Sequence, residues 1–395
     1  MNRINYKALM LLAAVLIAAL LVGGKFVYGL FFITFFLILL CYIMGRSIYK
    51  NLINIVWKGT NKVEVGDKIS ISTDLYNSGL FPAPYLKVNV NLPQKLTGEE
   101  PRTHIYSIMS GAKKNIGKEI MCRHRGVFKV GHLEVEFSDI LGIFGWKKVF
   151  DDEVFIVVYP RVIPLKAFNI PVRQPYGTVT VSQNAYEDFA STKDIRKYIT
   201  GDSLKKMHWK VTAHKGDFYV RNVELNASAD LNIFFDLHAA SYRDEYADDL
   251  EEKGAECAVS IIRYALTGSM SVNFTAKADK AVSLSGKDIN SFREFMDIIT
   301  KTSRNGDVPV WDLVKREARK LDWDATVVVI TPYLKELPVD AIHTLESTGV
   351  DLVLIYICRD RNEEHEEIDR LKMSGIRVFI VGIQDDIRQV LGGIA

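Results

Sequence analysis

The stretch of this sequence richest in groups that could do chemistry runs from Asp194 to Arg221. It reads Asp194-x-Arg196-x-Tyr198-x-x-Gly201-Asp202, continues to His208-Trp209-Lys210 and ends at Arg221. Eight basic residues fall in 193–221 against three acidic ones. Such a set could clamp a phosphate or a nucleic acid, supply a His-based acid–base site, or form a docking surface.

The same string also has a purely structural interpretation. Asp202 precedes a predicted helix over 203–213 and is a natural N-cap, and Gly216 would end that helix. His208 would lie beside the apolar stripe of the helix, which is formed by Leu204, Met207 and Val211. The Asp-x-Arg pair that opens the string could fix the approach to the helix by charge-assisted hydrogen bonds. We therefore favour a structural clamp over a catalytic site.

A second candidate is the loop Asp236-Leu237-His238-Ala239-Ala240. A magnesium-binding loop of the form Asp-x-Ser-x-Ser would supply hard oxygen ligands. Here His238 and Ala240 stand at the two serine positions, and alanine cannot ligate. We expect a degenerate loop that holds no metal.

Nucleophilic catalysis has little support in the sequence. It contains neither a Gly-x-Ser-x-Gly elbow nor a Gly-x4-Gly-Lys-Ser/Thr phosphate loop. Cys122 and His124 would share a face if they lay on a strand, but cysteine is commonly a small core residue. We predict no catalytic residue and no cofactor.

The elements that would position these residues change in character along the chain. After about residue 228, four dense apolar segments are separated by amphipathic helical stretches: Leu231–Asp236, Thr326–Thr331, Leu352–Ile357 and Arg377–Ile383. This pattern predicts a doubly wound parallel sheet covered on both faces, over residues 228–395. Ligands of such folds sit at the carboxyl ends of the strands, here near Asp236 and Thr331.

Residues 59–162 instead show short alternating segments with turn chemistry between them. Examples are 68–72 and 87–92, punctuated by Asn77-Ser78-Gly79. We predict a small antiparallel β-sandwich. A linker with the polar string would then occupy residues 163–227.

The first 58 residues are predicted to be a transmembrane helical hairpin. Ala8 to Met44 are almost wholly apolar, with one interruption at Gly23-Gly24-Lys25. A single helix of that length would span about 55 Å, against about 30 Å for the hydrocarbon core. Two helices, over about 8–22 and 26–44, avoid this mismatch. A cleaved signal peptide is the alternative.

The distribution of charge predicts on which side of the membrane the rest of the chain lies. Residues 1–50 hold five basic residues and no acidic one, so the rest of the chain has 45 basic and 48 acidic residues. The basic flanks of both helices predict that both ends, and the domains that follow, are cytoplasmic at the cell membrane. Four cysteines without a Cys-x-x-Cys spacing agree with a reducing compartment. The acidic excess argues against a nucleic-acid partner, although a local basic patch could bind anionic lipid.

Taken together, these segments resemble the bacterial domain of unknown function 58 family. The string from Asp194 to Arg221 carries the resemblance, with three further matches: Arg125-Gly126, Asp139-Ile140-Leu141-Gly142-Ile143-Phe144 and Tyr159-Pro160-Arg161. The resemblance implies a von Willebrand factor A-like C-terminal domain. It also implies partners: a MoxR-type AAA+ ATPase and a transglutaminase-like membrane protein.

Three functions are considered. The first is a membrane-anchored, non-enzymatic scaffold or adaptor that recruits the ATPase or its client. The second is an uncharacterised hydrolase that uses Asp202 and His208, and an anionic-lipid binder acting through 193–221 is a further alternative.

Overall fold

The computed structural model divides the chain into two compact units. Unit 1 comprises residues 1–163, 242–259 and 293–304, and unit 2 comprises residues 164–241, 260–292 and 305–395. The structure describes residues 3–4, 6–58, 62–99, 103–152, 154–168, 192–197, 207, 209–223, 230–243, 245–321, 325–334, 345, 350–361 and 366–392.

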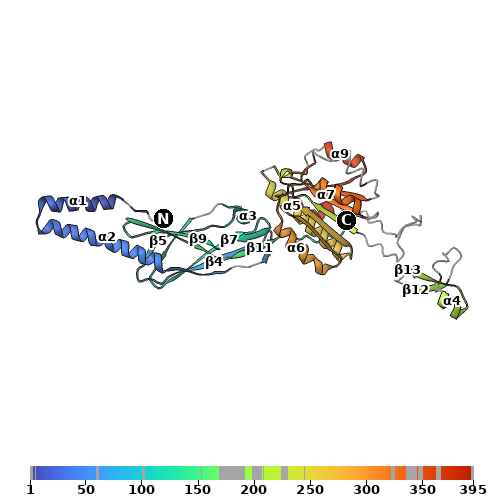
Figure 1. The fold of residues 1–395 in the computed structure, drawn as a ribbon, viewed down its shortest axis with the longest axis horizontal. Helices are drawn as coiled ribbons and strands as arrows, with labels where there is room; N and C mark the ends of the chain where they lie inside the picture. Colours follow the sequence, from blue (N-terminus) through green and yellow to red (C-terminus); the bar gives the residue numbers. More distant parts are fainter. Residues whose placement is uncertain are drawn as a thin grey trace. The chain divides into compact units, whose positions relative to one another are not determined.

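Unit 1 begins with two apolar helices, α1 (Tyr6–Val22) and α2 (Lys25–Asn51), which lie side by side (Figure 1). Gly23 and Gly24 connect them with φ of 67° and 93°, a backbone conformation that side chains with a Cβ rarely adopt. Within the described residues, α2 is the one helix that is both long and apolar enough to cross a membrane.

Helix α2 extends to Asn51, well beyond the end at Met44 that the apolar run predicted. One face of its last two turns is buried within unit 1. Gly45 lies against the Trp146 ring, and Ile48 belongs to a sandwich core. The ammonium group of Lys148 donates hydrogen bonds to the carbonyl of Tyr49, in the last turn of the helix, and to that of Leu52, which follows the helix. Tertiary packing therefore continues the helix past its apolar segment.

The remainder of the first part of unit 1 is a set of mostly antiparallel strands. Their bounds are β1 Arg3–Ile4, β2 Leu52–Lys58, β3 Lys62–Glu64, β4 Lys68–Asn77, β5 Ala83–Val90, β6 Thr103–Ile108, β7 Lys113–Met121, β8 Gly126–Lys129, β9 His132–Ser138, β10 Phe144–Asp151 and β11 Phe155–Tyr159, with a short helix α3 at Gln94–Thr97. They form three sheets with the orders β1-β10-β9-β5-β6, β2-β4-β7 and β3-β11-β8. The first sandwich strand starts at Leu52, seven residues earlier than the sequence predicted, because β2 pairs with β4 directly after α2.

Alternation of apolar and polar residues explains the sandwich. In β4, every second residue from Ile69 to Asn77 is buried, whereas the residues that alternate with them are more exposed. Two clusters of buried side chains result. One surrounds Trp146 and the end of α2, and the other surrounds Cys122 and Phe128 at the opposite end of β4.

Unit 2 is built on a six-stranded sheet with the order β16-β15-β14-β17-β18-β19. The strands are β14 Asp230–Phe235, β15 Ser271–Lys277, β16 Ala281–Gly286, β17 Thr326–Thr331, β18 Asp351–Cys358 and β19 Arg377–Gly382. All neighbours are parallel except β16, which pairs antiparallel with β15 at one edge. The four strands predicted from apolar segments are β14, β17, β18 and β19, and the order is that of an open doubly wound sheet.

Helices complete this α/β part of the chain. Their bounds are α5 Ala247–Thr267, α6 Phe292–Lys301, α7 Val310–Glu317, α9 Glu366–Met373 and α10 Ile387–Leu391. Helix α7 packs on β14 and β15, and α9 and α10 pack on β19. The first half of α5 and most of α6 belong to unit 1. A separate hairpin of β12 (Thr192–Lys197) and β13 (Tyr219–Val223) carries the short helix α4 (Trp209–Lys215).

Candidate functional site: the Arg125 cluster

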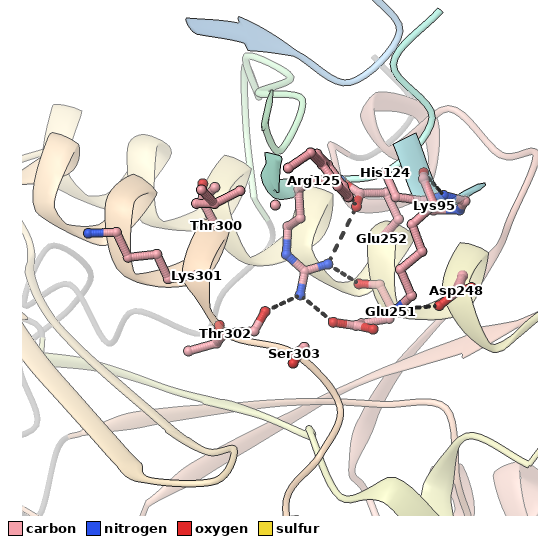
Figure 2. Close-up of a pocket in the computed structure, with 13 residues that line it drawn as sticks. Lys95, His124, Arg125, Asp248, Glu251, Glu252, Thr300, Lys301, Thr302 and Ser303 are labelled. Carbon is pink, nitrogen blue, oxygen red and sulfur yellow. Dashed lines mark hydrogen bonds and ion pairs between the residues drawn. The ribbon is translucent and has the colours of Figure 1, made fainter. Parts of the chain in front are cut away.

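The densest polar cluster in the described part of unit 1 surrounds Arg125, in the connection between β7 and β8. Only 3% of its side chain is exposed. The guanidinium Nη2 donates to Glu251 Oε1 at 2.8 Å, and the backbone N–H of Arg125 donates to Glu252 Oε2 at 2.8 Å (Figure 2). Both carboxylates come from the first turns of α5.

Three backbone carbonyls accept the remaining donors of the guanidinium. Nε donates to the carbonyl of Ile299 at 3.0 Å, Nη2 to that of Thr302 at 3.3 Å and Nη1 to that of Glu251 at 3.2 Å. Ile299 and Thr302 lie at the end of α6, where helix carbonyls lack intrahelical partners and the helix dipole favours a cation. Arg125 therefore caps one helix while it binds acidic residues of another.

Further charged side chains surround Arg125, Glu251 and Glu252. Asp248 accepts from Lys95 at 2.9 Å (Figure 2). It also accepts from Arg304 at 2.6 Å, and His124 Nε2 lies 3.0 Å from Asp249 Oδ1. Asp248 and Asp249 occupy the first turn of α5, where the helix dipole stabilises negative charge.

The pKa values of the carboxyl groups follow from burial and from these partners. Burial raises the pKa of Glu252 above its usual value, and the guanidinium of Arg125 opposes that effect only in part. Burial also acts on Asp248, but Lys95 and Arg304 outweigh it and hold the pKa of Asp248 below its usual range. The more deeply buried carboxyl is thus the harder one to ionise.

These residues line a cavity of about 420 Å³. All three nitrogens of the guanidinium are hydrogen-bonded within the cluster, and no nucleophilic side chain is placed against a base there among the described residues. The arrangement holds three chain segments together. We interpret the cluster as a structural lock.

The structure corrects the placement of Cys122 and His124. Both follow β7, which ends at Met121, so they do not share a strand face. Cys122 is fully buried in a sandwich core, and burial raises the pKa of its thiol to about 11. His124 instead contacts the carbonyl of Lys95 and the carboxylate of Asp249. The two side chains therefore do not form a catalytic pair.

The polar string is described only in part. Asp194 and Arg196 lie in β12 and Arg221 lies in β13, where Arg196 pairs with Val220 in the ladder and Ile195 with Arg221. Trp209 and Lys210 begin α4, so the described helix covers 209–215 rather than the predicted 203–213. Gly216 follows it with φ of 76°, as expected for a helix end. Tyr198, Gly201, Asp202 and His208 lie outside the described residues, so the clamp stays a prediction.

The string from Asp194 to Arg221 also lies within the segment that matches a known family. The model of the family described as "Protein of unknown function DUF58" matches residues 194–286, which begin at Asp194 and run through β16. This match supports the DUF58 family, and over residues 194–286 the resemblance seen in the sequence is confirmed.

No curated protein matches this chain. Solved structures align with parts of it at low similarity. The alkylpurine DNA glycosylase AlkC of Pseudomonas fluorescens, bound to DNA containing an abasic site analogue, is 14% identical over 27% of this chain and 30% of its own, with a TM-score of 0.20. The CARDB domain of the PF1109 protein of Pyrococcus furiosus is 14% identical over 28% of this chain and 90% of its own, with a TM-score of 0.20. Proximal thread matrix protein 1 from the mussel byssus is 14% identical over 33% and 38%, with a TM-score of 0.27.

The loop after β14 lies within the matched DUF58 segment. The carboxylate of Asp236 is buried and accepts hydrogen bonds from the Thr331 hydroxyl at 2.7 Å and from the backbone N–H of His238 at 2.9 Å. Both oxygens thus have protein donors at the carboxyl edge of the sheet. Among the described residues, no group of three or more His, Cys, Asp and Glu side chains could hold a metal ion.

We expect Asp236→Asn to change how the stability of the protein depends on pH. Burial, the largest cause, raises the pKa of Asp236 in the folded state above that in the unfolded chain. The wild type therefore loses stability as the pH rises through this folded-state pKa, whereas asparagine does not ionise. Thermal melting from pH 4 to pH 8 should show the melting temperature of the variant rising relative to wild type. A constant difference across that range would contradict the assignment.

Most residues of the Arg125 lock were not predicted from the sequence. Arg125 was noted only as part of a family match. Glu251, Glu252 and the carbonyl of Thr302 were not identified. Glu251 and Glu252 follow two aspartates at the start of an amphipathic helix, which is typical of a solvated helix end. The signal that could have found Glu251 is its place next to Leu250, which is buried in the structure.

Proposed function

We propose that this DUF58 protein is a membrane-anchored, non-enzymatic adaptor that recruits a cytoplasmic partner. Helix α2 is the main support for the membrane anchor. It is apolar over most of its 27 residues, and it passes without a loop into β2, the first strand of the sandwich. A membrane-spanning α2 would therefore hold the folded part of unit 1 directly at the bilayer surface.

The anchor in this proposal is a two-helix hairpin with both ends in the cytoplasm. Strand β1 supports it, since Arg3 and Ile4 pair with Gly145 and Phe144 at the start of β10. The chain just before α1 and the end of α2 are thus both tied to β10. The basic flanking residues at these two ends favour the cytoplasmic side.

The non-enzymatic part of the proposal is supported by the Arg125 cluster. All three nitrogens of the Arg125 guanidinium are used to bind chain segments to one another. A hydrolase that uses Asp202 and His208 is the competing hypothesis, and the experiment below distinguishes it from the adaptor.

The partner in this proposal is a MoxR-type AAA+ ATPase, with a transglutaminase-like membrane protein as a second member of the assembly. Family resemblance suggests both. The recruiting surface is assigned to unit 2, interpreted as a von Willebrand factor A-like domain. The parallel sheet with one antiparallel edge strand, β16, supports this interpretation.

Substitutions in the polar string test the adaptor against the hydrolase. We expect Arg196→Ala to lower the melting temperature and to weaken partner recovery together, at a cost of roughly 3–5 kcal/mol if it leaves a buried carboxylate unpaired. Asp202→Ala should remove a helix cap worth about 1 kcal/mol. Thermal melting and affinity purification from solubilised membranes, with mass spectrometry, measure both effects.

Lys197→Ala is the matched control, since Lys197 lies in the same strand and forms an exposed pair with Asp217. It should leave both readouts close to wild type. His208→Ala separates the two classes of function. Normal stability with loss of a hydrolytic activity of the purified protein would overturn the adaptor.

A further inference from the structure

The loop between β9 and β10, residues 139–143, is a short turn whose tip is apolar. Ile140 is 61% exposed and Leu141 is 52% exposed. Isolated apolar side chains on a surface need no explanation, but here two adjacent ones form the tip of one ordered turn.

The turn is held rigidly by its own hydrogen bonds. The buried carboxylate of Asp139 accepts from the backbone N–H of Leu141 at 3.1 Å and from that of Phe144 at 2.6 Å. The N–H of Gly142 donates to the carbonyl of Asp139, and Gly142 has φ of 67°. Three backbone donors of the turn are therefore satisfied within it, which lowers the cost of moving the turn into a medium without water.

The position of the turn along α2 is also fixed. Ile143 packs in one cluster with Ile38 and Cys41 of α2, and the Asp139 carboxyl lies beside the Cys41 thiol. Cys41 precedes Arg46, the first basic residue after the apolar run, by five positions, or about 7 Å along the helix. Ile38 lies about 12 Å from Arg46 by the same measure. Basic residues that flank a span mark the headgroup level, so the turn lies at or below the edge of the acyl region.

We propose that the 139–143 turn is a membrane-inserted wedge that buries Ile140 and Leu141 among the acyl chains beside α2. This inference rests on the proposed membrane anchor and deepens it. Partly buried apolar side chains at this depth match those of interfacial anchors, which reach about 5–10 Å into the headgroup–acyl boundary. The wedge fixes the sandwich against the bilayer at a second point and restrains rotation about α2.

A lipid surface is the occupant that the observations favour over a protein partner. The turn packs against the apolar part of α2, which a spanning helix keeps in contact with lipid, so its surroundings are the same medium. The neighbouring α2 side chains Leu37 and Leu40 are themselves exposed and apolar.

Thiol labelling of the full-length protein tests the wedge. Ile140→Cys and Met121→Cys are each placed in the otherwise unchanged chain, whose four native cysteines are buried. Met121 is an exposed residue, at 46%, near the end of β4 opposite α2, since it pairs with Lys68. That position is about 30 Å along the strand from Asn77. Each protein is reconstituted into phosphatidylcholine nanodiscs, which leave both bilayer faces accessible, and is treated with a charged maleimide.

A turn exposed to water and a turn inserted in lipid predict opposite orders of reactivity for the two cysteine variants. From exposure in the folded chain alone, Ile140→Cys should react at least as fast as Met121→Cys. With the wedge in lipid, Ile140→Cys should react slower by about tenfold or more, because each unit by which the medium raises the thiol pKa lowers the reactive thiolate tenfold.

Other outcomes separate the wedge from the anchor. Equal or faster labelling of Ile140→Cys in a protein that co-elutes with the nanodiscs overturns the wedge and leaves the anchor standing. Protection in native membranes but not in nanodiscs means that a protein covers the turn, which also overturns it. Failure of the protein to associate with nanodiscs at all overturns the anchor, and the wedge with it.

Discussion

Arg125→Ala is expected to destabilise unit 1 by about 3–5 kcal/mol. The substitution leaves Glu251 and Glu252 buried without the guanidinium that now compensates them, and it leaves the carbonyls at the end of α6 without a donor. Chemical denaturation of the detergent-solubilised protein, followed by tryptophan fluorescence, measures the change in the free energy of unfolding.

Two further variants show whether buried charge is the cause. Lys129→Ala removes an ion pair with Asp151 that lies in solvent, only four residues from Arg125, and should leave stability nearly unchanged. The triple variant Arg125→Leu, Glu251→Leu and Glu252→Leu should recover much of the loss, because an apolar cluster leaves no unpaired charge. If the triple variant is as unstable as Arg125→Ala, the cluster is not held by charge compensation.

Gly45→Leu should separate α2 from the sandwich. A Cβ built at Gly45 would lie 1.9 Å from the Trp146 ring, and that ring is itself stacked on Phe137 within the core. The ring cannot move without disturbing the core, so the overpacking cost is at the upper end of about 1–3 kcal/mol or above it. Limited proteolysis between α2 and β4, together with thermal melting, should show earlier cleavage and a lower melting temperature.

Gly29→Ala is the control on the same helix. No atom lies within 4 Å of a Cβ built there, and alanine favours helix over glycine by up to about 1 kcal/mol. It should therefore be neutral or slightly stabilising. Gly45→Leu combined with Trp146→Ala should regain part of the lost stability if the clash with the ring is the cause. Equal effects of Gly45→Leu and Gly29→Ala would show that the close approach is unimportant.

The architecture of unit 2 follows largely from local sequence. Strands β14, β17, β18 and β19 lie inside the parallel sheet or at its far end and have long apolar runs, since both faces of such a sheet are covered. Strands β15 and β16 were not predicted. β16 is an edge strand whose residues alternate between exposed and half-buried, and β15 mixes polar and apolar residues. Neither shows the dense apolar run by which the other strands were found.

The sequence determined by itself the apolar helices, the alternating strands of the sandwich and the absence of serine at positions 238 and 240. Each of these depends on residues within about ten positions of one another, where periodicity and turn chemistry act. Tertiary structure alone decided the lock and the close approach of α2. Arg125 meets Glu251 only because two segments far apart in the chain fold together, and Gly45 meets Trp146 for the same reason. In the sequence, each is an ordinary polar or small residue, because its partner is fixed by packing and not by spacing.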